Sequence, residues 1–327
     1  MNRSYLIIQT AFLGDAILAT ALAESLHKDD PAGRISILVR KGHESLFGNH
    51  PFIHEVLVWN KRSSKLKNLL GVIRKVRKNK YDVVINLQRF FSTGLITACS
   101  GASVRVGFNK NPLSMFFTNS KLHAFGDGTH EVERNLSLIS ELSGNLNSRP
   151  KLYPTSEDRK ALVSLNGSEY VVMAPASVWK TKQMPIEKWV ELGILCSKKY
   201  KIVFTGGKND RQLCEDIAGK ADRGNCMNLA GELNFLESAA LMEHAAMNYV
   251  NDSGPLHLAS AVNAPVTAFF CSTVPEFGFG PLSEVSRVVE SSPRPDCKPC
   301  GMHGKKECPL NHFDCGKKIE LSDDLVP

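Results

Sequence analysis

Residues 5–26 read YLIIQTAFLGDAILATALAESL, and this stretch decides the fold. Tyr5–Gln9 form a short apolar run that is typical of a buried strand, and Ala16–Leu26 repeat apolar residues at helical spacing. A glycine in the loop between them lets the backbone turn sharply. A strand, a loop and a helix in this order predict one unit of a parallel sheet that helices cover.

The same alternation continues along the whole chain. Further strands are predicted at Ile35–Val39, Glu55–Trp59, Tyr81–Leu87, Val104–Phe108, Tyr170–Ala174, Lys201–Thr205, Met247–Val250 and Val266–Phe270. Further helices are predicted at Leu66–Lys78, Pro185–Lys198, Asp210–Lys220, Phe235–His244 and Gly254–Ala261. Alternation of this kind makes parallel sheets that are covered on both faces.

The alternation breaks between Gly144 and Ser168, where Gly, Pro, Asn and Ser residues cluster. We therefore expect two domains, 1–150 and 151–327, with a cysteine-rich tail on the second. Each is predicted to be a Rossmann-like, doubly wound parallel sheet. The carboxyl ends of the two sheets are expected to face each other across a ligand-binding cleft.

Composition limits the possible partners. Of 327 residues, 43% are hydrophobic and 22% charged, as in a soluble globular protein, and the net charge is +7. This mild excess favours acidic small molecules, phosphates or an anionic surface over a dedicated nucleic-acid partner. Asp15 interrupts the apolar opening, which counts against a signal peptide. Five scattered cysteines resemble reduced core thiols, so a cytoplasmic location is expected.

The loop Thr10–Asp15 is the first candidate site. Asp15 is expected at the start of a helix and at the carboxyl edge of the sheet. It is either a capping carboxylate, worth about 1 kcal/mol, or a general base that reaches a substrate hydroxyl. The loop lacks the GxGxxG pattern of a dinucleotide site, which lowers the case for a nicotinamide or flavin enzyme.

Two loops in the second half have groups that suit a phosphate. Ser177 and Lys182 follow the strand Tyr170–Ala174, either as phosphate contacts or as parts of a solvated loop. The segment NDSGPLHLASA, residues 251–261, opens a helix whose free N–H groups at Ser253 and Gly254 form an anion site. Asp252 would cap the helix, orient a neighbour or meet a hydroxyl. His257 is either structural or a hydrogen-bond donor to a pyrophosphate.

The tail and one helix leave alternatives open. Cys297, Cys300, Cys308 and Cys315 either hold a structural zinc ion or pack as reduced thiols. Residues 60–80 contain nine basic residues and no acid, among leucine, isoleucine and valine at helical spacing. This pattern predicts an inward apolar face of Leu66, Leu69, Leu70, Ile73 and Val76 and an exposed basic face. The basic face is either merely solvated or makes peripheral contact with an anionic membrane surface or a phosphorylated acceptor.

Nearly the whole chain resembles glycosyltransferase family 9, the lipopolysaccharide heptosyltransferase family. The resemblance rests on FLGDAILATALAESL, YDVVINLQRF, SGASVRVGF, GGKNDRQLCEDIA and CKPC…CPLNHFDC. The most specific match is NDSGPLHLASAVNAPVTAFFCSTVPEFGFGP, residues 251–281.

The resemblance implies a GT-B fold that binds the acceptor in its first domain and the nucleotide sugar in its second. It implies inverting transfer of heptose from ADP-heptose to a lipopolysaccharide core or lipid A acceptor, with no cofactor or metal required. Asp15 becomes the catalytic base. The implied donor-binding residues are Ser177, Lys182, Asp210, Asp252, Ser253, Gly254 and His257. The enzyme would work in the cytoplasm, at the inner face of the inner membrane if the basic helix binds lipid.

Two rival functions stay open. One is a GT-B glycosyltransferase or epimerase that uses another nucleotide sugar. The other is a non-enzymatic basic protein that binds polyanions or membranes. The lack of interleaved aromatic and basic residues counts against nucleic-acid binding.

Overall fold

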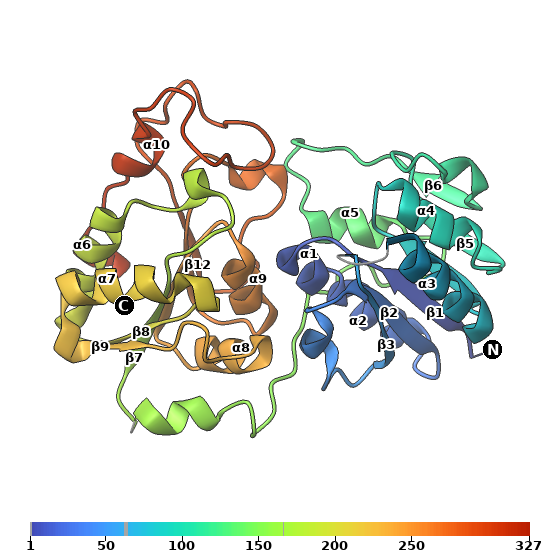
Figure 1. Ribbon diagram of the computed structural model, residues 1–327, viewed down its shortest axis with the longest axis horizontal. Coiled ribbons are helices and arrows are strands. Elements are labelled where there is room, and N and C mark those ends of the chain that lie inside the picture. Colours follow the sequence, from blue (N-terminus) through green and yellow to red (C-terminus); the bar gives the residue numbers. More distant parts are fainter. Residues whose placement is uncertain (1, 62–64, 166) are drawn as a thin grey trace. The chain divides into compact units, whose positions relative to one another are not determined.

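The computed structural model describes residues 2–61, 65–165 and 167–327. The chain divides into two compact units, Met1–Tyr153 and Pro154–Pro327. Each unit contains one six-stranded parallel sheet with helices against it (Figure 1). The expected α/β class, with two doubly wound parallel sheets, is confirmed.

The helices and strands of the first unit alternate as the sequence predicts. Its strands are β1 (Ser4–Ile8), β2 (Arg34–Arg40), β3 (Ile53–Trp59), β4 (Val83–Asn86), β5 (Val104–Phe108) and β6 (Asn119–Lys121). Its helices are α1 (Leu13–Leu18), α2 (Thr20–Asp29), α3 (Lys65–Asn79), α4 (Phe91–Ala98) and α5 (Glu131–Ser137).

The second unit repeats this pattern. Its strands are β7 (Tyr170–Ala174), β8 (Lys201–Phe204), β9 (Cys226–Asn228), β10 (Met247–Asn251), β11 (Val266–Phe269) and β12 (Ser286–Val289). Its helices are α6 (Ile186–Ser197), α7 (Arg211–Ala221), α8 (Phe235–Glu243), α9 (Gly254–Ala261) and α10 (Asp314–Lys317). Two short 3₁₀ turns, η4 (Lys180–Lys182) and η5 (Lys208–Asp210), follow β7 and β8.

The two sheets have the same topology. The first runs β3-β2-β1-β4-β5-β6, and the second, from its other edge, runs β9-β8-β7-β10-β11-β12. In each, the strand order reverses beside the unit's first strand, where Ile8 pairs with Asn86 and Ala174 pairs with Val250. Doubly wound sheets bind ligands outside the carboxyl ends of the strands at such a reversal. The topology therefore points to one crevice in each unit.

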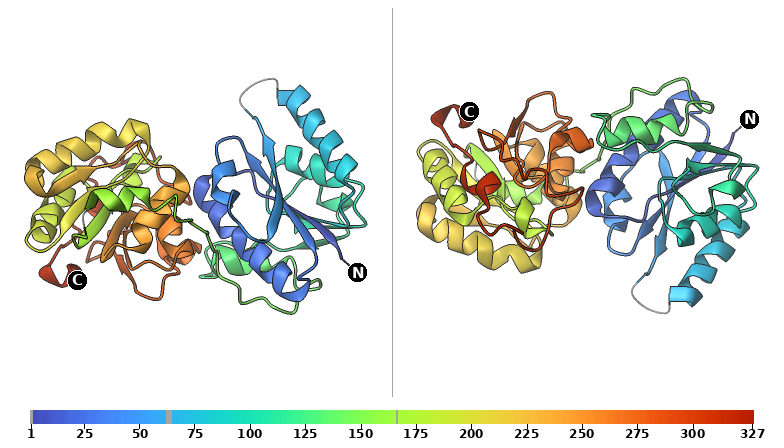
Figure 2. Two further views of the ribbon diagram at one scale, coloured as in Figure 1. Left: turned by 90° about the horizontal axis from the view of Figure 1, so that it is seen from below. Right: turned by 90° about the horizontal axis from the view of Figure 1, so that it is seen from above.

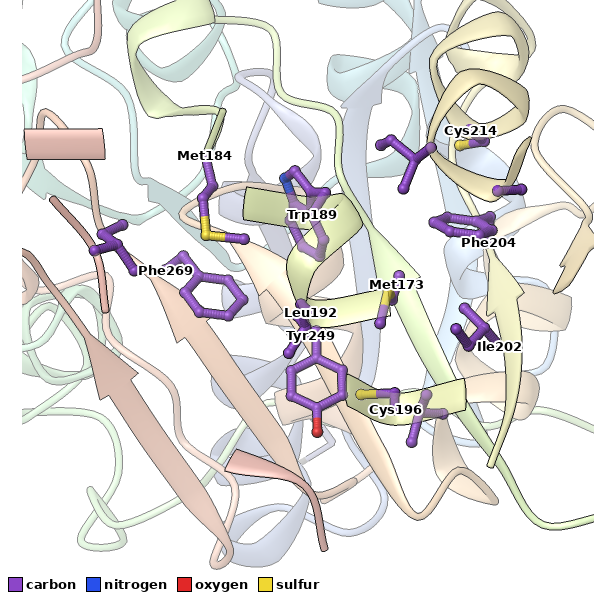
Figure 3. Close-up of a cluster of buried hydrophobic side chains, with 14 of the residues drawn as sticks. Met173, Met184, Trp189, Leu192, Cys196, Ile202, Phe204, Cys214, Tyr249 and Phe269 are labelled. Atoms are coloured by element: carbon purple, nitrogen blue, oxygen red, sulfur yellow. The ribbon is translucent and has the colours of Figure 1, made fainter. Parts of the chain in front are cut away.

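Separate apolar cores hold the two units. In the first, Leu69, Ile73 and Val76 of α3 pack onto the sheet beside Trp59. In the second, Trp189 packs edge-on against Phe269 with ring centroids 5.5 Å apart (Figure 3). Each unit therefore has a core of its own. Burying one aromatic side chain such as Phe269 contributes about 1.5–3 kcal/mol to it.

Two expectations about helices are wrong. The predicted helix Ala16–Leu26 is divided at Ala19 into α1 and α2, and the buried hydroxyl of Thr20 donates to the Ile17 carbonyl at 2.7 Å. Such a side-chain bond competes with the backbone pattern of a continuous helix. On α3, Leu66 and Leu70 do not face the core, because they are 78% and 51% exposed.

The helices that the structure describes are too short or too polar to cross a membrane.

Candidate functional site

An ion pair lies at the strand-order reversal of the second unit. The ammonium of Lys182, in η4 after β7, lies 2.6 Å from Oδ2 of Asp252, which follows β10. The same oxygen accepts a hydrogen bond from the hydroxyl of Thr273 at 2.6 Å. The lysine side chain is 16% exposed and the aspartate side chain 7%. Asp252 therefore holds a lysine at the edge of the sheet, with part of its surface open to solvent.

Helix α9 begins beside this ion pair. Ser253 is its N-cap residue, and Pro255 follows Gly254 in the first turn. The Ser253 hydroxyl makes no capping bond to the helix. The backbone N–H groups at such a start and the positive end of the helix dipole favour an anion. His257, one turn further on, is buried with its ring edge-on to Phe279 at 6.2 Å between centroids.

The other two predicted donor-binding residues lie in neighbouring loops. The Ser177 carbonyl accepts from Nε2 of Gln183 at 2.6 Å, which fixes the loop that leads to Lys182. Asp210 lies in η5 after β8, and its carboxylate accepts from the Gly207 N–H at 2.7 Å. Since β8 is next to β7, Asp210 lies at the same sheet edge as Lys182. All the predicted donor-binding residues therefore follow β7, β8 or β10.

The cysteine-rich tail is hydrogen-bonded to the loop that contains Lys182. The Thr181 N–H donates to the Lys305 carbonyl at 3.1 Å, and the Lys305 N–H donates to the Thr181 hydroxyl oxygen at 2.7 Å. A side chain at Gly304 would lie 2.8 Å from Cγ of Lys182. Only a glycine lets the tail lie this close, so the tail helps to position Lys182.

The four tail cysteines are close enough to influence one another. Burial, with smaller effects from the nearby thiols of Cys300, Cys297 and Cys308, raises the pKa of Cys315 to about 11. Burial also raises the pKa of Cys300. Within the described part of the chain, no three His, Cys, Asp or Glu side chains form a group that could hold a metal ion. Both alternatives for the tail, zinc or packed thiols, stay predictions.

In the first unit, Asp15 lies in the first turn of α1, after β1. Its carboxylate accepts from the Phe12 N–H at 3.2 Å, and its side chain is half-buried. The carboxylate thus caps the helix at the strand-order reversal. A cap and a general base need the same placement, so the geometry allows both roles.

Two cations lie next to the Asp15 loop. The Lys61 ammonium donates to the backbone carbonyl and the hydroxyl of Thr10, at 2.9 and 2.8 Å. Burial, with a smaller effect from Arg40, lowers the pKa of Lys61 to about 8. The Arg40 guanidinium lies 5.5 Å from the centre of the Phe12 ring. The candidate base is therefore on a loop with positive charge beside it.

Buried amides lie at the same carboxyl edge of the first sheet, at the ends of β1 and β4. Nε2 of Gln88 donates to Oε1 of Gln9, and Nδ2 of Asn111 donates to the Gln88 carbonyl at 2.8 Å. Gln88 Oε1 and Nδ2 of Asn86 are buried without a hydrogen-bond partner among the described residues. Buried polar groups normally find partners, so these two are suited to a polar ligand.

The sequence alone does not predict several residues at the carboxyl edges of the two sheets. Thr273 has no predicted role, and Gln9, Gln88 and Lys61 are not among the predicted site residues. Thr181 is predicted only as part of the phosphate-binding loop with Lys180 and Lys182, and not as a contact of the tail. Thr273 lies inside the quoted segment 251–281, so its signal was present. The others depend on which loops meet at a sheet edge, which residue spacing does not show.

The shared strand order, repeated in two Rossmann-like units, defines a GT-B fold. The model of the family described as "Glycosyltransferase family 9 (heptosyltransferase)" matches residues 69–311, and the chain belongs to that family. The family expected from the sequence is confirmed, and the chain is a glycosyltransferase.

Known relatives agree along most of the chain. Lipopolysaccharide heptosyltransferase 3 of Escherichia coli strain K12 is 29% identical over 80% of each chain. The structure of E. coli ADP-heptose lps heptosyltransferase II is similar with a TM-score of 0.78 and 20% identity, over 92% of this chain and 96% of that one. An E. coli heptosyltransferase with ADP-2-deoxy-2-fluoro heptose gives 0.72 and 18%, over 88% and 93%.

Proposed function

We propose that this glycosyltransferase moves a heptose from ADP-heptose to a hydroxyl group of a lipopolysaccharide core acceptor in the cytoplasm. The names of its relatives, lipopolysaccharide heptosyltransferases 3 and 2, support this substrate class. A related structure was solved with an ADP-sugar. The observation that carries the proposal is the pairing of Lys182 with Asp252 beside the first turn of α9.

The second unit binds the donor in this proposal. A nucleoside diphosphate needs positive charge along its pyrophosphate, and Lys182 with the N–H groups of Ser253 and Gly254 supplies it. Asp252 fixes the ammonium before the donor arrives, so little reorganisation is needed as charge grows on the leaving group. Ser177 and His257 are further phosphate contacts, and Asp210 meets the nucleoside.

The first unit binds the acceptor, and Asp15 is the base. The acceptor oxygen attacks the anomeric carbon from the face opposite ADP, and the bond from that carbon to the ADP oxygen breaks. The bonding electrons leave with ADP, and the hydroxyl proton passes to the Asp15 carboxylate. Attack from the opposite face inverts the anomeric centre.

Mass spectrometry of the reaction products tests the proposal. The purified chain is incubated with lipopolysaccharide core acceptors and a panel of ADP- and UDP-sugars. We expect the mass of one heptose to be added from ADP-heptose alone, both with and without a chelator. Transfer from a UDP-sugar would refute the donor assignment. Loss of transfer in the chelator that Mg²⁺ restores and Zn²⁺ does not would refute the metal-independent mechanism.

A further inference from the structure

Helix α3 exposes a mixed face of basic and apolar side chains. Leu69, Ile73 and Val76 are buried in the core of the first unit. The side facing solvent includes a group that we call the α3 face: Lys65, Leu66, Lys67, Leu70, Arg74, Arg77 and Lys78. Arg62, which belongs to the same basic stretch of sequence, lies outside the described residues. The exposed face is therefore cationic and apolar at once.

The positive charge of this face is not neutralised locally. The helix sequence, KLKNLLGVIRKVRKN, contains no acid. Lys75, on the helix but outside the face, is paired with Glu55 at 2.9 Å. Lys67, Arg74, Arg77 and Lys78 have no acidic group within 4.0 Å among the residues that the structure describes. The Debye length at physiological salt is about 8 Å, so salt only partly screens these charges from a surface that the helix touches. Their attractions to that surface therefore add up.

The two exposed leucines add an apolar contribution. Leu66 and Leu70 lie one helical turn apart, and 78% and 51% of their surfaces are exposed. Long basic side chains next to them can keep their charges at a headgroup while their methylene stems and the leucines enter the acyl boundary. A soluble polyanion would neutralise the charges but would not cover the leucines.

The α3 face adjoins the loop of the candidate base. Trp59 ends β3 at the carboxyl edge of the sheet, and α3 starts shortly after it, on the flank of the sheet seen in Figure 2. The Asn68 amide donates to the Asn60 carbonyl at 3.0 Å, and Lys61 bonds Thr10 in the Asp15 loop. A surface bound by α3 would thus lie near the loop that contains Asp15.

We propose that the α3 face docks the first unit onto a bilayer that contains anionic phospholipid. Opposite charge attracts the basic residues, and Leu66 and Leu70 enter the headgroup boundary. This docking goes beyond the proposed transfer reaction and does not depend on it, because a vesicle without acceptor is enough to bind the helix.

Sedimentation with vesicles tests the docking. We expect binding to vesicles of equal parts phosphatidylglycerol and phosphatidylcholine, weak binding to phosphatidylcholine alone, and loss of binding at high salt. Lys67→Glu/Arg74→Glu/Lys78→Glu should weaken binding by about a hundredfold, since each basic residue contributes about fivefold. Leu66→Ser/Leu70→Ser should weaken it by about tenfold. The leucine variant should bind heparin as well as the parent chain does.

A matched charge reversal on the second unit is the control. Lys220→Glu/Arg223→Glu/Lys317→Glu changes the net charge equally, at exposed positions away from α3, and should keep vesicle binding. In addition, Leu70→Trp should show a blue-shifted emission with anionic vesicles. Equal losses in the control and the α3 triple variant would overturn the proposal. So would equal binding to both kinds of vesicle, or a leucine variant that binds vesicles normally.

Discussion

The two units share one strand order, but the loops at their strand-order reversals have opposite chemistry. After β1 comes a carboxylate, Asp15, on a loop that Lys61 contacts. After β7, the same position in the second sheet, comes a lysine, Lys182, which an aspartate holds. The same fold thus places a carboxylate near two cations in the first unit and a lysine paired with a carboxylate in the second. The fold sets where a ligand binds, and a few loop residues set which charge is needed there.

Replacing the carboxylate of the first unit should have the largest effect. Asp15→Asn can still accept the Phe12 N–H, so it keeps the cap and removes only the basic oxygen. We expect turnover to fall by about 10²–10⁴-fold. Affinity for ADP, measured by calorimetry, should change little because the proposed donor site is in the second unit. Near-normal turnover of Asp15→Asn would show that Asp15 only caps the helix and is not the base.

Replacing Lys182 in the second unit should weaken donor binding instead. Lys182→Ala should weaken ADP binding by about ten- to a hundredfold, the range for a hydrogen bond to a charged group. Lys180→Ala is the matched control, because Lys180 lies in the same turn but is exposed. If both variants bound ADP like the parent chain, the nucleotide site would lie elsewhere.

Mild acid should destabilise the first unit more than the second, because His43 and His50 lie in the first. Burial lowers the pKa of His43 and of His50 to about 4, with smaller effects from Arg40 and His27. The unfolded chain therefore binds more protons than the folded one between pH 6.5 and 4, and stability falls as the pH falls through this window. The loss at pH 5 should be about 1–2 kcal/mol for His43. It should be smaller for His50, because its Nε2 lies 3.6 Å from the Glu24 carboxylate, which favours the protonated ring.

Fluorescence can assign this loss, because Trp59 lies in the first unit and Trp179 and Trp189 lie in the second. Urea unfolding at pH 7 and pH 5 should shift the midpoint of a Trp179→Phe/Trp189→Phe variant more than that of a Trp59→Phe variant. Equal shifts would contradict the assignment to His43 and His50.

The smallest expected effect comes from the tail. Gly304→Ala places a methyl group against Lys182 and Trp179 and should push the tail off the loop that contains Lys182. We expect weaker ADP binding than in the parent chain, but a smaller loss than in Lys182→Ala. Gly219→Ala, a matched change in the same unit with open space around the new Cβ and no positive φ, should bind ADP more tightly than Gly304→Ala.

The sequence predicts most of the fold because the inner strands are strongly apolar. Tyr170–Ala174 and Val104–Phe108 have the predicted bounds. The edge strands β6, β9 and β12 were not predicted, since segments such as Asn119–Lys121 are short, polar and paired on one side only. Leu66 and Leu70 were misplaced because helical spacing alone does not show where a sheet ends and solvent begins.

The candidate site was predictable where one loop contains the chemistry. Asp252, Ser253 and Gly254 are adjacent in sequence, and a Pro in the next position marks the helix start. The partnership of Lys182 with Asp252 joins residues 70 positions apart and follows only from the pairing of β7 with β10. The bracing of Thr181 by Lys305 depends on the path of an irregular tail, for which no local pattern exists.

The path of that tail also affects the order in which the chain can fold during synthesis. Tyr249, in the middle of the second sheet, donates its hydroxyl to the Leu325 carbonyl at 2.7 Å, and Ile319 is buried in the same core. The first unit, Met1–Tyr153, is compact by itself, so we expect it to fold while the ribosome is still translating the second. The second cannot close its core until residues 319–325 have emerged. A nascent chain stalled before that point would present a folded first unit joined to an unfinished second unit.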